Sequence, residues 1–393
     1  METPQQWNKI KEIFGAALER PPAERAPFLD EACARDASLR VEVESLLSEF
    51  EKSSGLSQHP ISGQLLDPPP LQSKSIGPYR LLRKLGEGGM GQVWLAEQAV
   101  PVRRQVALKL IRAGIDDQAV LQRFQSERQS LAIMDHPAIA KVFDAGATPE
   151  GQPYFVMEYV QGVSITAYCD QHQLKIRDRL ELFIKVCEGM LHAHQKAIIH
   201  RDLKPANILV VEVDGKPTPR IIDFGLAKVI GPQAAGNSGN TVFTQAGGFV
   251  GTPVYMSPEQ ADPRVRDLDT RTDVYSLGVV LYELLTGSLP FDPKQWHEQP
   301  LDEVLRQLRE QDPPRPSTKV ETQKDSSTAA AQMRGTEPNQ LVSLLHGDLD
   351  WITMKALEKD RTRRYETASG FAATTTTGPL AESAFGCRCS PGM

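Results

Sequence analysis

The stretch IHRDLKPANIL, residues 199–209, determines how the rest of the chain is interpreted. It places three chemically different side chains on one short loop: the carboxylate of Asp202, the amine of Lys204 and the amide of Asn207. A carboxylate can accept a proton, an amide oxygen can bind a divalent metal ion, and an amine can offset negative charge. Because a His-Arg-Asp tripeptide occurs by chance in many chains, the interpretation depends on partner motifs elsewhere.

The composition is that of an ordinary globular protein. The 393 residues are 40% hydrophobic and carry a formal net charge of −6, with no basic tail to attract nucleic acid. Cys387 and Cys389 are too close together for ordinary zinc-ligand spacing, so we expect reduced thiols. The longest apolar stretch, around Leu277 to Leu285, is too short to span a bilayer. We therefore expect a cytoplasmic chain with no membrane segment and no nucleic-acid partner.

The ends of the chain differ in composition from its middle. Residues 1–52 carry two apolar stripes at helical spacing, which predict a small helical segment whose stripes either pack on each other or dock another protein. Residues 53–77 are rich in Ser, Gly and Pro and predict a flexible linker. Residues 374–393, which begin in a run of threonines, predict an irregular tail.

Between these ends, residues 78–373 predict one catalytic domain. Short β-type runs dominate up to residue 160 and helical spacing follows, which predicts a small lobe at 78–160 and a large lobe at 161–373. Within the large lobe, residues 313–340 are polar and rich in Pro, Ser and Thr, so we expect a long flexible insertion there.

A glycine-rich motif, LGEGGMGQVWLAE, opens the small lobe. Gly86, Gly88 and Gly91 let the backbone fold over a triphosphate without interference from a Cβ atom. The same spacing suits a dinucleotide-binding turn, but there the glycines begin a helix. Here residues 92–95 continue as a strand, which favours a phosphate-covering loop between two strands.

Lys109 lies in the apolar strand VALKLI, where a lysine is costly unless it has a charged partner. The helix that follows offers Glu127 beside an apolar face, and we expect this pair to form. Further on, the strand RIIDFG ends in Asp223. Together with Asn207, this carboxylate supplies the oxygen ligands that suit Mg²⁺ or Mn²⁺ rather than zinc. His192 and His194, on the helix before the loop, are interpreted as packing or surface residues.

Together these motifs resemble the eukaryotic-like serine/threonine protein kinases of bacteria, over about residues 79–373. The resemblance implies an α+β, two-lobed fold in which ATP binds between a small β-sheet lobe with one main helix and a larger, mainly helical lobe. The small N-terminal helical segment precedes this fold. The resemblance also implies transfer of the ATP γ-phosphate to Ser or Thr hydroxyls of protein substrates in bacterial signalling, with transient homodimers for autophosphorylation.

The resemblance assigns roles to individual residues. The catalytic residues are Asp202, Lys204, Lys109 and Glu127, and the metal ligands are Asn207 and Asp223. The residues expected to bind ATP lie on four stretches of the chain: Leu85, Gly86, Gly88, Gly91, Val93, Ala107, Lys109, Met157, Glu158, Val160 and Leu209.

Regulation is expected on the loop at 226–251, whose composition is that of a mobile segment. Thr244 is the leading phosphorylation site because it lies eight residues before Thr252, and Thr241 is nearby. Arg201 would pair with the phosphate and order the loop. Thr252 is expected to position the substrate.

Three further residues are expected to be structural. Glu259 and Arg364 would form an ion pair, and the Asp273 carboxylate would accept backbone N–H groups of the catalytic loop. Ser257 stands where such kinases more often have Ala, a change expected to be harmless.

Two other functions are weighed. A pseudokinase that presents its N-terminal helices to a partner usually lacks the lysine, the catalytic Asp or the metal Asp, and none is lost here. A small-molecule kinase fits less well, because Thr252 and residues 251–259 suit a peptide.

After Ala368 the sequence AATTTT shows no apolar period, so we expect the large lobe to lack its last helix.

Overall fold

The computed structural model divides the chain into two compact units, Met1–Leu71 and Gln72–Met393. The boundary falls inside the linker predicted at 53–77. The parts of the chain that the structure describes are residues 75–88, 91–111, 133–224, 253–265, 267–296 and 299–377, with a few positions between 13 and 43.

In the first unit, the described buried side chains form a single hydrophobic cluster: Ile13, Ala17, Leu29, Cys33 and Val43. Ile13 and Ala17 belong to the first apolar stripe and Val43 to the second. The two stripes therefore pack on each other, which is one of the two arrangements that the sequence left open.

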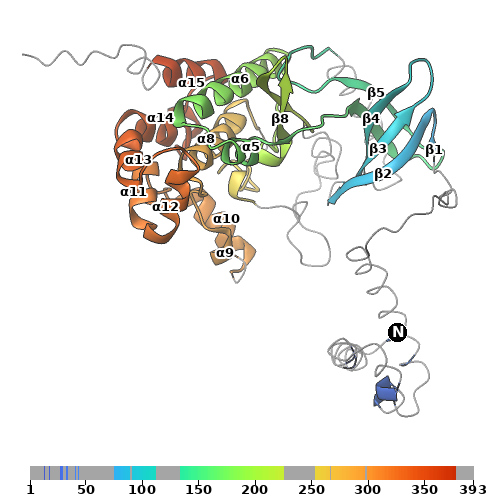
Figure 1. Ribbon diagram of the computed structural model, residues 1–393, viewed down its shortest axis with the longest axis horizontal. Helices are drawn as coiled ribbons and strands as arrows, with labels where there is room; N and C mark the ends of the chain where they lie inside the picture. Colours follow the sequence, from blue (N-terminus) through green and yellow to red (C-terminus); the bar gives the residue numbers. More distant parts are fainter. Residues whose placement is uncertain are drawn as a thin grey trace, which may run out of the picture. The chain divides into compact units, whose positions relative to one another are not determined.

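The second unit begins with a six-stranded antiparallel sheet (Figure 1). Its strands lie in the order β1-β2-β3-β4-β6-β5. Their bounds are β1 Ser75–Ile76, β2 Tyr79–Gly88, β3 Gly91–Gln98, β4 Arg104–Ile111, β5 Val142–Ala147 and β6 Pro153–Glu158. The main helix predicted for this lobe, which would carry Glu127, lies outside the described residues.

Strand β4 is buried on both faces, and its alternation decides where Lys109 points. Val106 and Leu108 pack into the core of the small lobe. Ala107 and Ile111 face the other way and join the main hydrophobic core. Because side chains alternate along a strand, Lys109 lies on the same face as Ala107. The sheet thus directs the lysine toward the large lobe.

The large lobe contains a small sheet, β7-β8-β9, and a series of helices (Figure 1). The strands are β7 Val163–Ser164, β8 Ile208–Val213 and β9 Lys216–Ile221. The helices are α5 Ile165–Gln171, α6 Ile176–Gln195, α8 Arg271–Thr286, α9 Pro293–Trp296, α10 Leu301–Glu310, α11 Pro316–Thr322, α12 Lys324–Gln332, α13 Pro338–Leu345, α14 Asp348–Ala356 and α15 Ala368–Thr375. The α+β, two-lobed architecture predicted from the sequence is confirmed.

Helix α8 is the central helix of this lobe. It is apolar all round and almost every one of its residues is buried, as expected of a helix enclosed by others. It ends at Gly287, whose φ of 75° is the left-handed conformation that favours glycine at a helix C-terminus. Helices α6 and α14 pack against it.

The prediction of a flexible insertion at 313–340 was wrong. This segment forms α11, α12 and the start of α13, and its Val320 and Ala331 are buried in the main core. Its prolines begin helices rather than interrupt them, because Pro316 and Pro338 occupy first-turn positions where no backbone N–H is needed. Proline and a polar composition were therefore misleading signals.

The expectation that the large lobe lacks its last helix was also wrong. Helix α15 forms across the start of the threonine run. The Phe371 ring lies 5.2 Å from that of Phe183 on α6 and 4.8 Å from that of Tyr365. The threonine hydroxyls donate to carbonyls one turn earlier, as Thr375 does to Phe371 at 3.0 Å. The buried residues of α15, which are Ala368, Phe371, Ala372 and Thr375, recur at helical spacing, so one phenylalanine and three small residues are enough to pack the helix.

Two buried arginines hold the C-terminal end of α8. Arg334 donates to the carbonyls of Leu285 at 2.5 Å, Leu284 at 2.9 Å and Glu283 at 3.1 Å. Arg179 reaches the Leu284 carbonyl at 3.3 Å. The last carbonyls of a helix have no partner within the helix, so these guanidinium groups satisfy them and offset the negative end of the helix dipole. The segment misread as an insertion thus supplies an anchor of the central helix.

Replacing Arg334 by Met should destabilise the protein by about 3 kcal/mol, because buried carbonyl groups would lose their donor. The change is measured by equilibrium unfolding in urea. The matched control is Arg306→Met on α10, whose side chain is 54% exposed in its ion pairs and should cost about 0.5 kcal/mol or less. Equal losses in the two variants would show that Arg334 is no anchor.

Candidate active site

The loop at 199–209 connects α6 to a short 3₁₀ turn, η1 (Pro205–Asn207), and then to β8. The Lys204 amine lies 2.9 Å from the Asp202 carboxylate. Asn207 is 6% exposed, and its amide nitrogen donates to the Asp202 carbonyl at 2.8 Å. Since that nitrogen is engaged, the amide oxygen is the atom that can face a metal ion. The three side chains predicted to act together are therefore neighbours.

The backbone of this loop is held by the carboxylate of Asp273, in the first turn of α8. Its carboxylate accepts the N–H groups of His200 at 2.8 Å and Arg201 at 2.9 Å, as expected from the sequence. His194 lies 2.8 Å from the same carboxylate. Burial acts to raise the pKa of Asp273, but the hydrogen bond and charge of His194 outweigh it and keep the pKa below its ordinary value. Asp273 is thus a charged support for the loop.

The buried Lys109 has a carboxylate partner, as the sequence required. Lys109 is 4% exposed and forms an ion pair with Asp223, 114 residues later in the chain. Glu127, the partner expected first, lies outside the described residues. The pair connects β4 of the small lobe to the segment that follows β9.

Asp223 is tied to the catalytic loop through the residues beside it. The Ile222 N–H donates to the Asn207 carbonyl at 2.9 Å, and Phe224 packs on the His200 ring with centroids 4.7 Å apart. Burial lowers the pKa of His200, so its ring is neutral. Its Nδ1 lies 3.3 Å from the Asp202 N–H and its Nε2 3.1 Å from the Ile222 carbonyl, so Nε2 carries the proton. One imidazole therefore links both segments.

The residues expected to bind ATP lie on strands that pair with one another. Val93 is opposite both Gly86 and Lys109, and Ala107 is opposite Met157. Gly91 has a φ of 139°, and a Cβ there would lie 1.8 Å from the Leu110 carbonyl oxygen, so only glycine fits.

The other expected contacts are also placed by the strands. Leu85 and Gly88 lie on β2, Glu158 ends β6, and Val160 follows in the connection to the large lobe. Leu209 lies on β8. The residues expected to bind ATP therefore come from both lobes.

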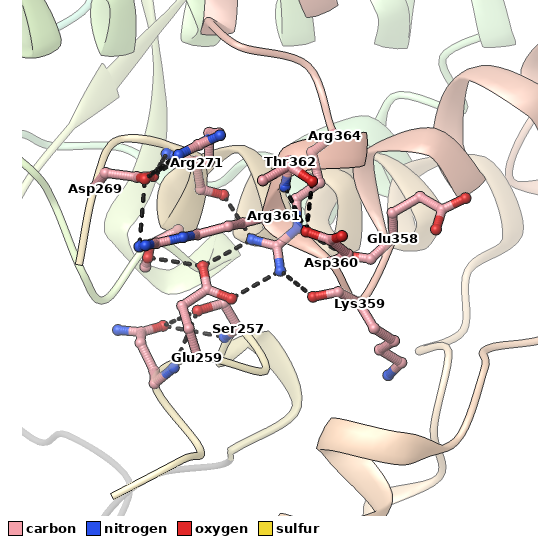
Figure 2. A network of polar contacts seen from close by, with 12 residues as sticks. Ser257, Glu259, Asp269, Arg271, Glu358, Lys359, Asp360, Arg361, Thr362 and Arg364 are labelled. Carbon is pink, nitrogen blue, oxygen red and sulfur yellow. Dashed lines mark hydrogen bonds and ion pairs between the residues drawn. The ribbon is translucent and has the colours of Figure 1, made fainter. Parts of the chain in front are cut away.

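Glu259 and Arg364 form the ion pair predicted from the sequence (Figure 2). Two guanidinium nitrogens of Arg364 each lie 2.7 Å from a Glu259 oxygen. Thr272, in the first turn of α8, donates to the same carboxylate at 2.9 Å. Burial acts to raise the pKa of Glu259, but Arg364 outweighs it and holds the pKa below its ordinary value. Both acidic anchors, Glu259 and Asp273, therefore meet the N-terminal turn of α8.

Some contacts were not found from the sequence, and some predictions are not tested. His194 was interpreted as a packing or surface residue, and its contact with Asp273 was not foreseen because its helical position gave no sign of a polar partner on α8. Thr272 was not singled out, although it directly precedes Asp273. Thr241, Thr244 and Thr252 lie outside the described residues.

Residues 79–368 match the sequence model of the protein kinase domain family. The chain belongs to the protein kinase family. Serine/threonine-protein kinase PknB of Mycobacterium tuberculosis is 38% identical over 296 residues, which cover 74% of this chain and 41% of that protein. Serine/threonine-protein kinase Pkn1 of Myxococcus xanthus is 38% identical over 247 residues, or 62% of this chain and 34% of that one. The family predicted from the motifs is thereby confirmed.

The fold agrees with solved structures of this kinase family. The PknI kinase domain of Mycobacterium tuberculosis superposes with a TM-score of 0.53 at 23% identity, covering 79% of this chain and 99% of that one. This likeness concerns the fold. The chain spans about two fifths of the length of the PknB relatives that it matches. Within the described residues, no helix combines the length and apolar character needed to cross a membrane.

The Glu259–Arg364 pair should make stability depend on pH. A carboxylate with a lowered folded pKa stabilises the protein above its unfolded pKa, and the effect is lost as pH falls through the folded value. Glu259→Gln leaves the 3% exposed Arg364 without a countercharge and should cost about 3–5 kcal/mol at pH 7. The gap between variant and wild type should narrow below about pH 4.5.

Urea unfolding at several pH values measures this gap. Glu303→Gln removes an exposed carboxylate that also pairs with an arginine, and it should leave stability nearly unchanged at every pH. A gap for Glu259→Gln that stays constant down to pH 3 would contradict the assigned role.

Proposed function

We propose that this chain is an ATP-dependent serine/threonine protein kinase, which transfers the γ-phosphate of ATP to Ser or Thr hydroxyls of protein substrates. The single observation that carries the proposal is the meeting of two distant segments at the catalytic loop. Ile222, next to Asp223, is hydrogen-bonded to Asn207, and Asp223 is paired with Lys109. The similar proteins are serine/threonine-protein kinases, which supports Ser and Thr hydroxyls as the acceptors.

The residues present suit a divalent metal and ATP. The amide oxygen of Asn207 and the carboxylate of Asp223 form an all-oxygen donor set, which favours Mg²⁺ or Mn²⁺. When bound, the metal and nucleotide supply the phosphoryl group and neutralise the charge that develops on it. Lys109 provides a cation for the phosphates, and Gly86, Gly88 and Gly91, at the facing ends of β2 and β3, carry no Cβ that would obstruct them.

The remaining chemistry belongs to two side chains of the loop. The Asp202 carboxylate orients the acceptor hydroxyl and takes its proton. The Lys204 amine, 2.9 Å from that carboxylate, places a positive charge beside the transferred group. Thr252 is proposed to position the substrate, and Glu127 to pair with Lys109 in the catalytic arrangement.

We also propose a cytoplasmic location, and the family resemblance supports transient homodimers. No nucleic-acid partner is proposed, since the formal net charge is −6. The pseudokinase alternative is disfavoured, because Lys109, Asp202 and Asp223 are all present and two of them form an ion pair.

The decisive test is transfer of labelled γ-phosphate from Mg-ATP to the purified chain and to a generic basic protein. Asp202→Asn should lower the rate by about 100-fold or more, because the base is lost. The control, Asp302→Asn, changes an exposed carboxylate at the start of α10 and should retain wild-type activity. A wild-type chain that binds ATP and melts cooperatively but transfers no label would favour the pseudokinase alternative.

Thr244 is proposed as the activating phosphorylation site, with Arg201 as the partner of its phosphate. Thr244→Ala should lower activity toward the added substrate about tenfold, the value of one charge-assisted hydrogen bond. Peptide mapping of the autophosphorylated chain identifies the site, and Thr241→Ala is the matched control. Unchanged activity in Thr244→Ala, with label elsewhere, would exclude this assignment.

A further inference from the structure

The turn at residues 257–260 reaches the catalytic loop through the side chain of Gln260. Its amide nitrogen donates to the Arg201 carbonyl at 2.9 Å. Its amide oxygen accepts the Ser257 N–H at 3.0 Å and lies 3.3 Å from the Ser257 hydroxyl. Only the nitrogen can donate to a carbonyl, so Ser257 and Arg201 together fix the orientation of this amide.

Arg201 is a point of strain in the loop. Its φ of 64° lies in the left-handed region, which costs a residue with a side chain about 1–2 kcal/mol and persists only where the surroundings impose it. Its N–H is held by Asp273 and its carbonyl by Gln260. Two segments outside the loop therefore hold the two sides of one strained residue.

The Arg201 carbonyl and the Asp202 N–H belong to the same planar peptide group. Gln260 donates to the oxygen of this peptide group. The Asp202 N–H of the same group donates to His200 Nδ1 at 3.3 Å. When both ends of a peptide plane are held, its rotation is prevented. The direction in which Asp202 leaves the backbone is then fixed as well.

Gln260 is itself held in place by the residues beside it. Its own N–H and that of Ala261 donate to the Ser257 carbonyl at 3.0 and 3.1 Å, and Ser257 is fully buried. The preceding residue, Glu259, carries the ion pair with Arg364 shown in Figure 2. The turn is therefore a rigid base for the amide.

We propose that Gln260 is a positioning residue for phosphoryl transfer, which holds the Arg201–Asp202 peptide group and thereby aims the Asp202 carboxylate at the acceptor hydroxyl. The proposal rests on the role of Asp202 as base. It also gives Ser257 a purpose, because this residue orients the Gln260 amide. A misplaced catalytic group reduces the rate of the chemical step without weakening substrate binding.

The experiment compares two variants of Gln260 that differ in what they keep. Gln260→Met preserves the length of the side chain and removes both hydrogen-bonding functions. Gln260→Glu keeps an acceptor for the Ser257 N–H and loses the donor to Arg201. Both should lower kcat about tenfold or more, with KM for ATP and for the protein substrate unchanged within about twofold.

The matched control is Gln307→Met on α10. Gln307 is also half-buried, accepts from the Trp296 indole at 2.8 Å and donates to Gln299 at 2.9 Å, far along the chain from the loop. This variant should lower the melting temperature as much as Gln260→Met does, with kcat unchanged. If Gln260→Met keeps the wild-type kcat, or if Gln307→Met loses as much, the positioning role is refuted.

Amide hydrogen exchange at Asp202 tests the inference separately from activity. Exchange should be faster in Gln260→Met than in wild type, because the peptide group is released, and unchanged in Gln307→Met. If wild type transfers no Asp202-dependent phosphate, the proposed function fails, while faster exchange still supports the hold on Arg201. Unchanged exchange in Gln260→Met overturns the inference whatever the activity.

Discussion

The buried carboxylate of Asp273 is the interaction on which the rest of the site depends. It is charged, has no exposure to solvent and accepts two successive backbone N–H groups of the catalytic loop. A carboxylate in such surroundings is stable only with strong donors, so the loop and α8 hold each other in one arrangement. Every functional side chain on the loop takes its position from a backbone that is fixed at this point.

Charged groups of opposite sign hold the two ends of α8. Glu259, through Thr272, and Asp273 meet its N-terminal turn, while Arg334 and Arg179 meet its last carbonyls. This order agrees with the helix dipole, whose positive end is at the N-terminus. A helix that is apolar on its sides is thus oriented by the polar contacts at its ends, and the catalytic loop and the 257–260 turn both attach at the N-terminal one.

Local motifs were readable from the sequence because their residues act within one loop or strand. The grouping of Asp202, Lys204 and Asn207 followed from their positions on one short loop, whereas their roles came from the partner motifs and the family resemblance. Lys109 was expected to have an acidic partner because its strand is apolar. Which acid pairs with it is a long-range question. Asp223 lies on a different lobe, and the spacing along the chain gave no reason to place it beside the lysine.

The errors have the same origin. The composition of residues 313–340 is polar and suggests a flexible segment. The contacts that order it are distant in the sequence, since the carbonyls that Arg334 binds are about 50 residues away on α8. Helix α15 has too few apolar residues for a periodic signal, yet Phe371 finds two aromatic rings from other segments. His194 contacts the Asp273 carboxylate on α8 and Gln260 donates to the Arg201 carbonyl, and the sequence places neither partner beside them. Composition describes a segment alone, whereas these residues are explained by what they contact.

The separation of Glu259 and Arg364 along the chain sets an order on synthesis. The two residues are 105 positions apart, so at about 5–20 residues per second the ribosome adds Arg364 roughly 5–20 s after Glu259. During that interval the 257–260 turn has no guanidinium to hold it. The nascent chain already contains its catalytic residues but not the anchor of their support. The ion pair that supports the 257–260 turn can therefore form only after the segment that carries Arg364 has been synthesised.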